Sequence, residues 1–220
     1  MKRIIAIDFD GTLIRNEPAK KAHIEWFKIM AGALEDNSIK EYSKIKDYFP
    51  KVYEVMSRYT GLDQKKDKEL LRKFARNIFQ MSLIGMANKL KNKILVREFA
   101  DYLRSLKEKY TIALITTSPE DSVKPILELI KCEDIFDLIY KSSLTKEPDK
   151  KELLVEFVKD KGKPVCYIGN EGGDMIACKK LKIPSILVIW DKSADEKTKN
   201  MADYIANSVE DVKKAIKKIP

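Results

Sequence analysis

The chain has 220 residues, of which 44% are hydrophobic and 35% are charged. A chain of this size can bury a core of its own, as one domain with an insertion or as two small domains. The formal net charge is +9, but much of the excess comes from scattered lysines such as those in residues 65–68. Scattered lysines are typical of a solvated surface, so the charge argues against a nucleic acid as partner.

Three cysteines, Cys132, Cys166 and Cys178, form no CxxC pair. Their odd number and the apolar stretches around two of them predict buried free thiols in a reducing compartment. The apolar run at residues 4–7 is too short for a signal peptide, and no later run approaches the length of a membrane span. The sequence therefore predicts a soluble, cytoplasmic protein without a membrane partner.

Five short apolar runs are expected to form strands, and each ends in small or polar residues. They cover residues 3–7, 112–115, 138–140, 165–168 and 186–189. Helical patterns at 123–130, 151–158 and 174–181 separate most of them, and residues 209–219 carry the apolar stripe of a last helix. Such alternation is typical of a parallel sheet with helices on both faces, so the expected fold class is α/β.

The stretch from Asn16 to Asn92 interrupts this alternation, because it holds helical patterns and no convincing strand. Two apolar stripes in it are interpreted as its own core, one formed by Trp26, Phe27, Met30, Ala33 and Leu34 and the other by Leu70, Phe74, Ile78 and Met81. His23, the only histidine, is interpreted as a packing or surface residue. We expect a helical cap at 16–93, inserted after the first strand, and a core at 1–15 and 94–220. The alternative is that the insertion thickens the core.

Two acidic residues follow the first strand directly, as Asp8 and Asp10 of the segment DFDGT. Ligands of open parallel sheets bind beyond the carboxyl ends of the strands. Two carboxylates one residue apart can serve as nucleophile and proton donor at one phosphoryl group, and a divalent cation would offset their repulsion. Gly11 allows a sharp turn and a close approach of the backbone. Alone, the two acids also fit a plain metal site or a helix cap.

Three more candidate residues follow later strands. Thr116 offers a hydroxyl to phosphoryl oxygens, Lys146 offers a positive charge ahead of a helix, and Asp174 offers a hard oxygen ligand. Each has a simpler explanation, because Thr116 and Asp174 also suit helix caps and Lys146 also suits a surface. Their order at successive strand ends favours one shared phosphoryl site.

These segments resemble the signatures of the haloacid dehalogenase superfamily, on its phosphatase side. Residues 8–13 (DFDGTL) are similar to the first signature and residues 112–116 to the second. Residues 169–174 resemble the fourth, with Asn170 where an Asp is usual. The resemblance covers residues 1–15 and about 94–220, and it implies a Rossmann-like core with an inserted all-helical cap.

The third signature, a Lys often followed by Pro, is matched less closely. Glu147 separates Lys146 from Pro148, so Lys141 and Lys150 are kept as alternative assignments. The third signature therefore leaves three candidate lysines, with Lys146 as the first assignment.

The resemblance implies a role for each matched residue. Asp8 attacks phosphorus and forms an aspartyl-phosphate, and Asp10 acts first as general acid and then as general base. Thr116 and Lys146 complete the catalytic set. The implied cofactor is Mg²⁺, with the ligand candidates Asp8, Asp10, Asn170 and Asp174. We further expect substrate contacts from Gly11, Thr117 and Arg15.

Asn170 removes one negative charge from this set, so we expect it to weaken Mg²⁺ binding. The acid at Asp10 argues against dehalogenation, because a halide leaves without a proton. The predicted function is hydrolysis of a small phosphomonoester, such as a sugar phosphate, phosphoglycolate or a nucleotide. The alternatives are a phosphomutase and a weakly active phosphate-binding regulator. The sequence leaves the oligomeric state open.

Overall fold

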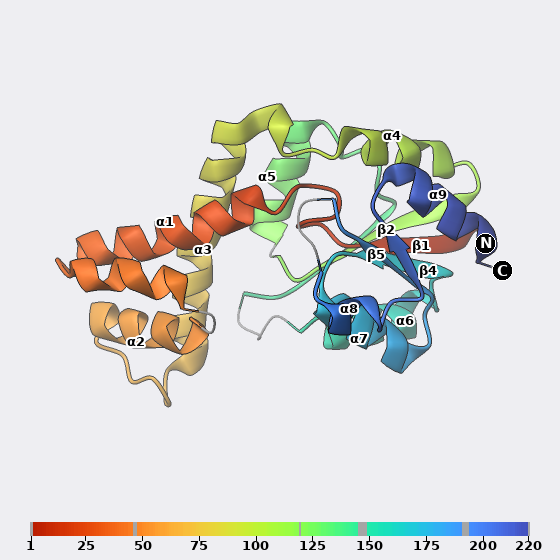
Figure 1. Ribbon diagram of the computed structural model, residues 1–220. Coiled ribbons are helices and arrows are strands. Elements are labelled where there is room, and N and C mark those ends of the chain that lie inside the picture. The colour runs from red at the N-terminus through yellow and green to blue at the C-terminus, as the bar shows by residue number, and fades with distance from the viewer. Residues whose placement is uncertain (1, 46–47, 119, 145–148, 191–193, 220) are drawn as a thin grey trace. The chain divides into compact units, whose positions relative to one another are not determined.

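A computed structural model describes residues 2–45, 48–118, 120–144, 149–190 and 194–219. The chain divides into two compact units, drawn together in Figure 1. The first unit comprises Met1–Asn16, Asn92–Ser142 and Pro148–Pro220, and the second comprises Glu17–Lys91 and Ser143–Glu147. The second unit thus enters the chain after the first strand. We call the two the α/β unit and the helical unit.

The α/β unit is built on a six-stranded sheet with the order β3-β2-β1-β4-β5-β6. Its strands are β1 (Arg3–Ile7), β2 (Tyr110–Thr116), β3 (Leu138–Lys141), β4 (Cys166–Gly169), β5 (Ser185–Val188) and β6 (Tyr204–Ala206). All five strand pairs are parallel. The predicted α/β class is confirmed, and the five predicted strands are all present.

Strand β1 lies between β2 and β4, with Ile7 in register with Leu114 and Ile168. The chain adds β2 and β3 on one side of β1 and then β4, β5 and β6 on the other. The strand order therefore reverses next to β1. Residues just beyond the carboxyl end of β1 lie at this switch point, where open α/β sheets bind their ligands.

Helices cover both faces of the sheet. In the α/β unit they are η2 (Lys91–Lys93, which begins at the last residue of the helical unit), α4 (Arg97–Leu106), α5 (Glu120–Ile130), α6 (Lys150–Lys161), α7 (Gly172–Leu181), α8 (Glu196–Lys199) and α9 (Val209–Lys218). Helices α6 and α7 pack against each other and the sheet, and α4 packs with α9 on the opposite face (Figure 1). The alternating apolar runs and helical stripes of the sequence produce this layered arrangement.

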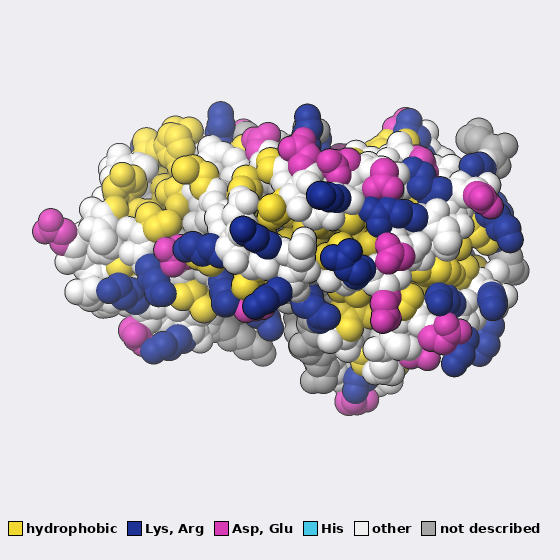
Figure 2. Space-filling view, turned by 90° about the horizontal axis from the view of Figure 1, so that it is seen from above, with side chains coloured by type: hydrophobic (Ala, Val, Ile, Leu, Met, Phe, Trp, Pro, Cys, Tyr) yellow, Lys and Arg dark blue, Asp and Glu magenta, His cyan; other side chains and the backbone are white. Residues whose placement is uncertain are grey.

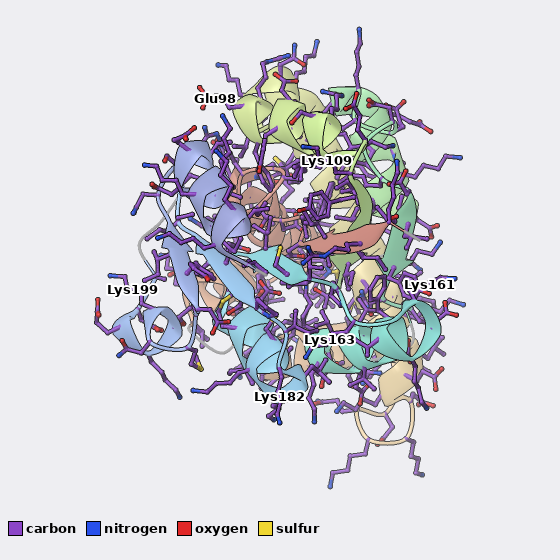
Figure 3. All side chains as sticks on the ribbon, turned by 90° about the vertical axis from the view of Figure 1, so that its right-hand side faces the viewer. Glu98, Lys109, Lys161, Lys163, Lys182 and Lys199 are labelled. Carbon is purple, nitrogen blue, oxygen red and sulfur yellow. The ribbon has the colours of Figure 1, made fainter. Side chains whose placement is uncertain are left out.

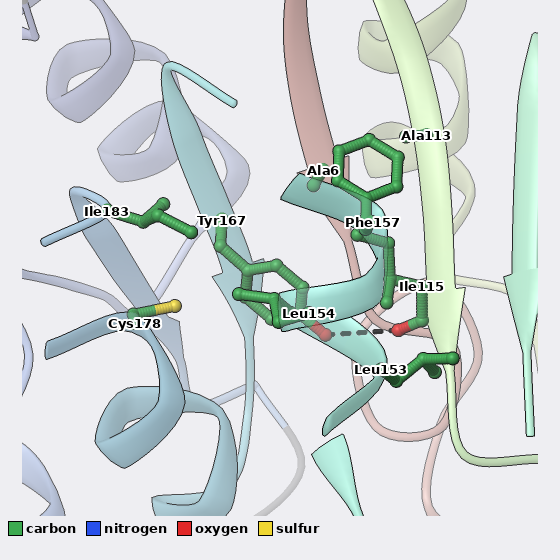
Figure 4. Close-up of a cluster of buried hydrophobic side chains, with 9 residues drawn as sticks. All are labelled: Ala6, Ala113, Ile115, Leu153, Leu154, Phe157, Tyr167, Cys178 and Ile183. Atoms are coloured by element: carbon green, nitrogen blue, oxygen red, sulfur yellow. Dashed lines mark hydrogen bonds between the residues drawn. The ribbon is translucent and has the colours of Figure 1, made fainter. Parts of the chain in front are cut away.

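One buried cluster fills the space between the sheet and helices α6 and α7 (Figure 4). Its members are Ala6, Ala113, Ile115, Leu153, Leu154, Phe157, Tyr167, Cys178 and Ile183. All three cysteines are buried and free, as predicted. Tyr167 is fully buried, so its hydroxyl needs a partner inside the protein.

Many basic residues of the α/β unit lie on its surface. Figure 3 labels Lys109, Lys161, Lys163, Lys182 and Lys199, whose side chains point outward. Several lysines pair with acids of the same segment, as Lys199 does with Glu196 at 2.8 Å. On the face shown in Figure 2, Lys and Arg side chains alternate with Asp and Glu. The positive charge is therefore dispersed over this face.

The helical unit contains α1 (Glu17–Ala33), η1 (Asn37–Lys44), α2 (Phe49–Thr60) and α3 (Lys68–Leu90). Trp26, Phe27 and Met30 of α1 belong to its buried cluster. Helix α2 ends at Gly61, whose φ of 75° is the left-handed conformation that favours glycine at a helix end. This unit thus has a hydrophobic core of its own.

The predicted core face of α3 was wrong for three of its four residues. Leu70, Phe74 and Met81 are 40%, 38% and 71% exposed, whereas Ile78 is partly buried and packs against the cluster. The buried face includes Leu71, Ala75, Leu83 and Ala87, and on α1 Ala33 is exposed as well. The Trp26 indole donates a hydrogen bond of 3.0 Å to the Ala75 carbonyl oxygen. So close an approach to the backbone requires small residues, so α3 presents its alanines rather than its largest apolar side chains.

Candidate active site

The turn after β1 places two acids at the switch point of the sheet. Asp8 is 7% exposed, and its backbone N–H donates to the Ile168 carbonyl oxygen at 2.9 Å. The Phe9 carbonyl oxygen accepts hydrogen bonds from the N–H groups of the three residues that follow Gly11. Asp8 is therefore held by the sheet itself, while Asp10 belongs to a tight turn.

Gly11 is required by the shape of this turn. Its φ of +76° is strained for any other residue, and a Cβ atom there would lie 2.1 Å from Nδ2 of Asn170 and 2.6 Å from the Asn16 amide. Two amide side chains thus pack directly against the Gly11 Cα. The predicted contact between Gly11 and substrate stays a prediction, as does that of Arg15.

Lys150 is the lysine that the structure brings to Asp8. Its Nζ lies 2.6 Å from Oδ1 of Asp8 and 3.2 Å from Oδ1 of Asp174. Lys150 is the first residue of α6, and Asp149 caps that helix by accepting from two backbone N–H groups. Lys146, our first assignment for the motif lysine, lies outside the described residues. Lys141, the other alternative, is the last residue of β3.

The end of β2 provides hydroxyl groups. Thr116 is buried, and its Oγ1 accepts a hydrogen bond of 3.0 Å from the Ser118 N–H. The Ser118 hydroxyl donates to Oδ2 of Asp10 at 2.7 Å. Thr117, between them, is half-buried. Thr116 and Asp10 are thus linked through Ser118, which sequence reasoning missed, although the run Thr-Thr-Ser at the end of a strand was a signal for it.

The segment after β4 contributes Asn170 and Asp174. Asp174 is 2% exposed, and its Oδ2 accepts from the Glu171 N–H at 3.1 Å as part of a capping box. Oδ1 of Asn170 accepts from the Thr12 hydroxyl at 3.5 Å. Within the described part of the chain, Nδ2 of Asn170 and Oδ1 of Asp10 are buried without a hydrogen-bond partner. Two unsatisfied polar atoms therefore flank the turn at Gly11.

Tyr167 joins this set from within the core. Its hydroxyl lies 2.8 Å from Nζ of Lys150, 3.1 Å from the Ile115 carbonyl oxygen and 3.3 Å from Oδ1 of Asp174. No pattern in the sequence signals this role, because a tyrosine inside an apolar strand is ordinarily a packing residue. The structure thus gathers Asp8, Lys150, Tyr167 and Asp174 at one point.

Burial governs the electrostatics of the site. It raises the pKa of Asp8 to about 7, because the nearby Lys150 ammonium only partly offsets desolvation and the Asp174 charge adds to the rise. Burial also raises the pKa of Asp10, and the hydrogen bond from Ser118 offsets only part of this rise. For Lys150, burial alone would lower the pKa, but the charges of Asp174 and Asp8 outweigh it and raise the pKa. Lys150 is therefore a permanent cation.

The side chains present fit a hard divalent cation. No group of three or more His, Cys, Asp or Glu side chains in the described ranges has the geometry of a metal site. The candidate donors are instead the carboxylates of Asp8 and Asp174, the amide oxygen of Asn170 and the backbone carbonyl of Asp10. These are all oxygen donors, which Mg²⁺ prefers. In addition, Oδ1 of Asp10 is buried without a hydrogen-bond partner, so a cation at this site would satisfy it.

The parallel sheet, with a buried aspartate paired to a lysine at its switch point, places the protein among the α/β proteins that bind a ligand beyond the carboxyl ends of their strands. The chain belongs to the haloacid dehalogenase-like hydrolases, because the sequence model of that family matches residues 2–182. The predicted family is thus confirmed, and the protein is a hydrolase of that family.

Solved structures with the same fold cover nearly the whole chain. A predicted phosphatase from Clostridium acetobutylicum shares 22% identity at a TM-score of 0.71, over 99% of each chain. A haloacid dehalogenase-like hydrolase from Streptococcus pneumoniae shares 18% at a TM-score of 0.68, over 98% of each chain. A mutant of CbbY from Rhodobacter sphaeroides, in complex with xylulose-1,5-bisphosphate, shares 17% at 0.64, over 94% of this chain and 95% of its own. At such identities these likenesses establish the fold.

A search among curated proteins finds no match. Among the residues described, no helix combines the length and apolar character needed to cross a membrane.

Proposed function

We propose that the protein is a magnesium-dependent phosphatase that hydrolyses a small-molecule phosphomonoester through an aspartyl-phosphate on Asp8. The observation that carries this proposal is the position of Lys150, whose Nζ contacts Oδ1 of both Asp8 and Asp174. Family membership and structural relatives described as phosphatases support it.

Asp8 is proposed as the nucleophile. It is buried at the switch point of the sheet and held by a backbone hydrogen bond to β4. In the first step a carboxylate oxygen of Asp8 bonds to phosphorus while the bond from phosphorus to the ester oxygen breaks. The leaving alcohol must then gain a proton. In the second step water attacks phosphorus, the bond from phosphorus to the Asp8 oxygen breaks, and inorganic phosphate leaves.

Asp10 is proposed as the group that moves protons. Its raised pKa favours the protonated acid that the first step needs. After protonating the leaving alcohol, the Asp10 carboxylate can take a proton from the attacking water. The hydrogen bond from Ser118 holds one oxygen, Oδ2, and leaves Oδ1 available for the substrate.

Lys150 and Thr116 are proposed to bind the phosphoryl oxygens. Charge develops on these oxygens during transfer, so a fixed ammonium and hydroxyl stabilise the transition state more than the ground state. Lys150 takes the role that we first gave to Lys146, because its contact with Asp8 supports it directly. Backbone N–H groups near Phe9 and Thr117 are proposed to complete the phosphoryl site.

The residues proposed to hold Mg²⁺ are Asp8, Asp10, Asn170 and Asp174. When bound, the ion would neutralise charge on the carboxylate and phosphoryl oxygens. Asn170 offers an amide oxygen where a carboxylate would add a charge, so this site should bind Mg²⁺ less tightly than an Asp would allow.

The helical unit is proposed to act as a cap, with 16–93 as the cap and 1–15 and 94–220 as the catalytic core. A cap that closes over a site excludes water and favours small substrates. Arg15, next to the start of the helical unit, is proposed to contact the substrate. The buried free thiols support the predicted reducing, cytoplasmic location.

The substrate class to test first is sugar phosphates, because a CbbY structure with this fold was solved with a sugar bisphosphate. The purified protein should be screened with Mg²⁺ against phosphorylated sugars, phosphoglycolate and nucleotides, and free phosphate measured. Asp8→Asn serves as the blank. Isomerised sugar phosphate without free phosphate would instead indicate a phosphomutase. Equal phosphate release by the wild type and Asp8→Asn would reject the proposed nucleophile.

A further inference from the structure

Four acceptors surround the ammonium group of Lys150. They are Oδ1 of Asp8 at 2.6 Å, the Tyr167 hydroxyl at 2.8 Å, the Ile115 carbonyl at 3.0 Å and Oδ1 of Asp174 at 3.2 Å. An ammonium group has only three hydrogens to donate. Lys150 therefore cannot satisfy all four acceptors alone.

The Tyr167 hydroxyl supplies the missing hydrogen. It lies within donating distance of the Ile115 carbonyl at 3.1 Å, drawn as a dashed line in Figure 4, and of Oδ1 of Asp174 at 3.3 Å. If Tyr167 donates its hydrogen to the Ile115 carbonyl, the three Lys150 hydrogens go to Asp8, Asp174 and the tyrosine oxygen. If Tyr167 donates to Asp174 instead, the three Lys150 hydrogens go to Asp8, the Ile115 carbonyl and the tyrosine oxygen.

In both arrangements one ammonium hydrogen points at the tyrosine oxygen. That hydrogen is the one that can be withdrawn at least cost, because a tyrosine hydroxyl that already donates keeps one partner. Withdrawing a hydrogen from Asp8, Asp174 or the Ile115 carbonyl would leave a buried acceptor short of a donor. Without the hydroxyl, the remaining three acceptors would take all three ammonium hydrogens.

We propose that Tyr167 is a positioning residue that frees one Lys150 N–H for a phosphoryl oxygen during transfer. Tyr167 itself is fully buried in the cluster behind the site and does not touch the substrate. Its hydroxyl replaces Lys150 at one buried acceptor, so the ammonium can turn toward the substrate without leaving that acceptor unpartnered. This inference rests on the proposed phosphatase function.

The test uses Tyr167→Phe, which keeps the ring and its packing and removes only the hydroxyl. Hydrolysis of p-nitrophenyl phosphate gives kcat and KM, and calorimetry gives the Kd of orthovanadate. We expect kcat to fall about ten-fold to a hundred-fold, which is the effect of losing one hydrogen bond to a charged group. We expect KM to stay within about two-fold and the orthovanadate Kd to weaken in step with kcat.

The matched control is Phe157→Leu, which alters the same buried cluster without touching a polar group. It should lower the melting temperature and leave kcat within about two-fold, so a loss of stability alone cannot imitate the expected result. A Tyr167→Phe enzyme with wild-type kcat and orthovanadate affinity would overturn the inference and leave the phosphatase proposal standing. A wild-type protein that neither hydrolyses any phosphate ester nor binds orthovanadate would overturn the proposed function, and the inference with it.

Discussion

Nζ of Lys150 lies 2.6 Å from Oδ1 of Asp8, although the two residues are 142 positions apart in the chain. The pair forms because β1 ends beside β4 at the switch point, while α6, which begins with Lys150, packs against β2 and β3. Both side chains are nearly buried, so their attraction is weakly screened by water. The ion pair thus depends on the whole sheet.

Replacing Lys150 should remove most of the activity. Lys150→Met keeps the length of the side chain and removes its charge beside the phosphoryl group. We expect kcat to fall about 10²-fold to 10³-fold, the usual effect of losing one transition-state donor. Lys141→Met and Lys146→Met are the matched controls, measured in the same phosphatase assay. A larger loss from Lys146→Met than from Lys150→Met would return the role to Lys146.

Asn170→Asp should tighten Mg²⁺ binding. Asn and Asp have nearly the same shape, so the variant fits against the Gly11 Cα as Asn170 does. It adds one negative charge to the proposed donor set and removes a buried amide nitrogen that has no hydrogen-bond partner. We expect Mg²⁺ to bind about ten-fold more tightly in calorimetric titration. Unchanged or weaker binding would show that Asn170 does not face the ion.

Gly11→Ala should disrupt the turn that carries Asp10. The new methyl group would lie 2.1 Å from Nδ2 of Asn170 at a φ of +76°. We expect a loss of at least about 2 kcal/mol in the free energy of unfolding, together with most of the activity. Gly85→Ala is the control, because nothing lies within 4 Å of its added Cβ inside α3. It should raise stability by about 0.5–1 kcal/mol. Equal effects of the two substitutions in urea unfolding would contradict this account.

His23 should make the helical unit less stable in acid. Desolvation lowers its pKa from 6.5 to about 4, although a hydrogen bond with the Ala19 backbone acts in the opposite direction. Nε2 of His23 lies 2.7 Å from the Tyr48 hydroxyl, and its ring packs on Phe79. Because the folded state holds the neutral ring, the stability contributed by His23 is complete above pH 6.5. It is lost as the pH falls toward 4, by about 3 kcal/mol in total.

Asp8, whose pKa is raised to about 7, titrates over part of the same range, so the comparison must be with His23→Phe. The quantity to measure is the difference in unfolding free energy between wild type and variant, from pH 7.5 down to 4.5. It should shift in favour of the variant as the pH falls. NMR titration is unambiguous, because His23 is the only histidine in the chain. A ring pKa near 6.5 in the folded protein would reject the prediction.

The sequence was sufficient for the features that depend on neighbouring residues. The apolar run before Asp8 and the turn at Gly11 are local, and so they predict β1 and the two acids that follow it. Alternation of apolar runs with helical stripes predicts parallel strands, and their carboxyl ends then meet at one edge. The α/β class and the family therefore followed from the amino-acid order.

Other features depended on distances between residues that are far apart in the chain. Spacing cannot say which of three lysines reaches Asp8, because that is set by where α6 begins relative to β1. Periodicity predicted that the face of α3 with the larger apolar side chains would be buried. In the structure the face with the alanines is buried instead, because it packs against α1. The hydroxyl of Tyr167 enters the site only because β4 lies beside β1, with Ile115 of β2 within reach. The role of these side chains thus depends on contacts between distant parts of the chain, which exist only in the folded protein.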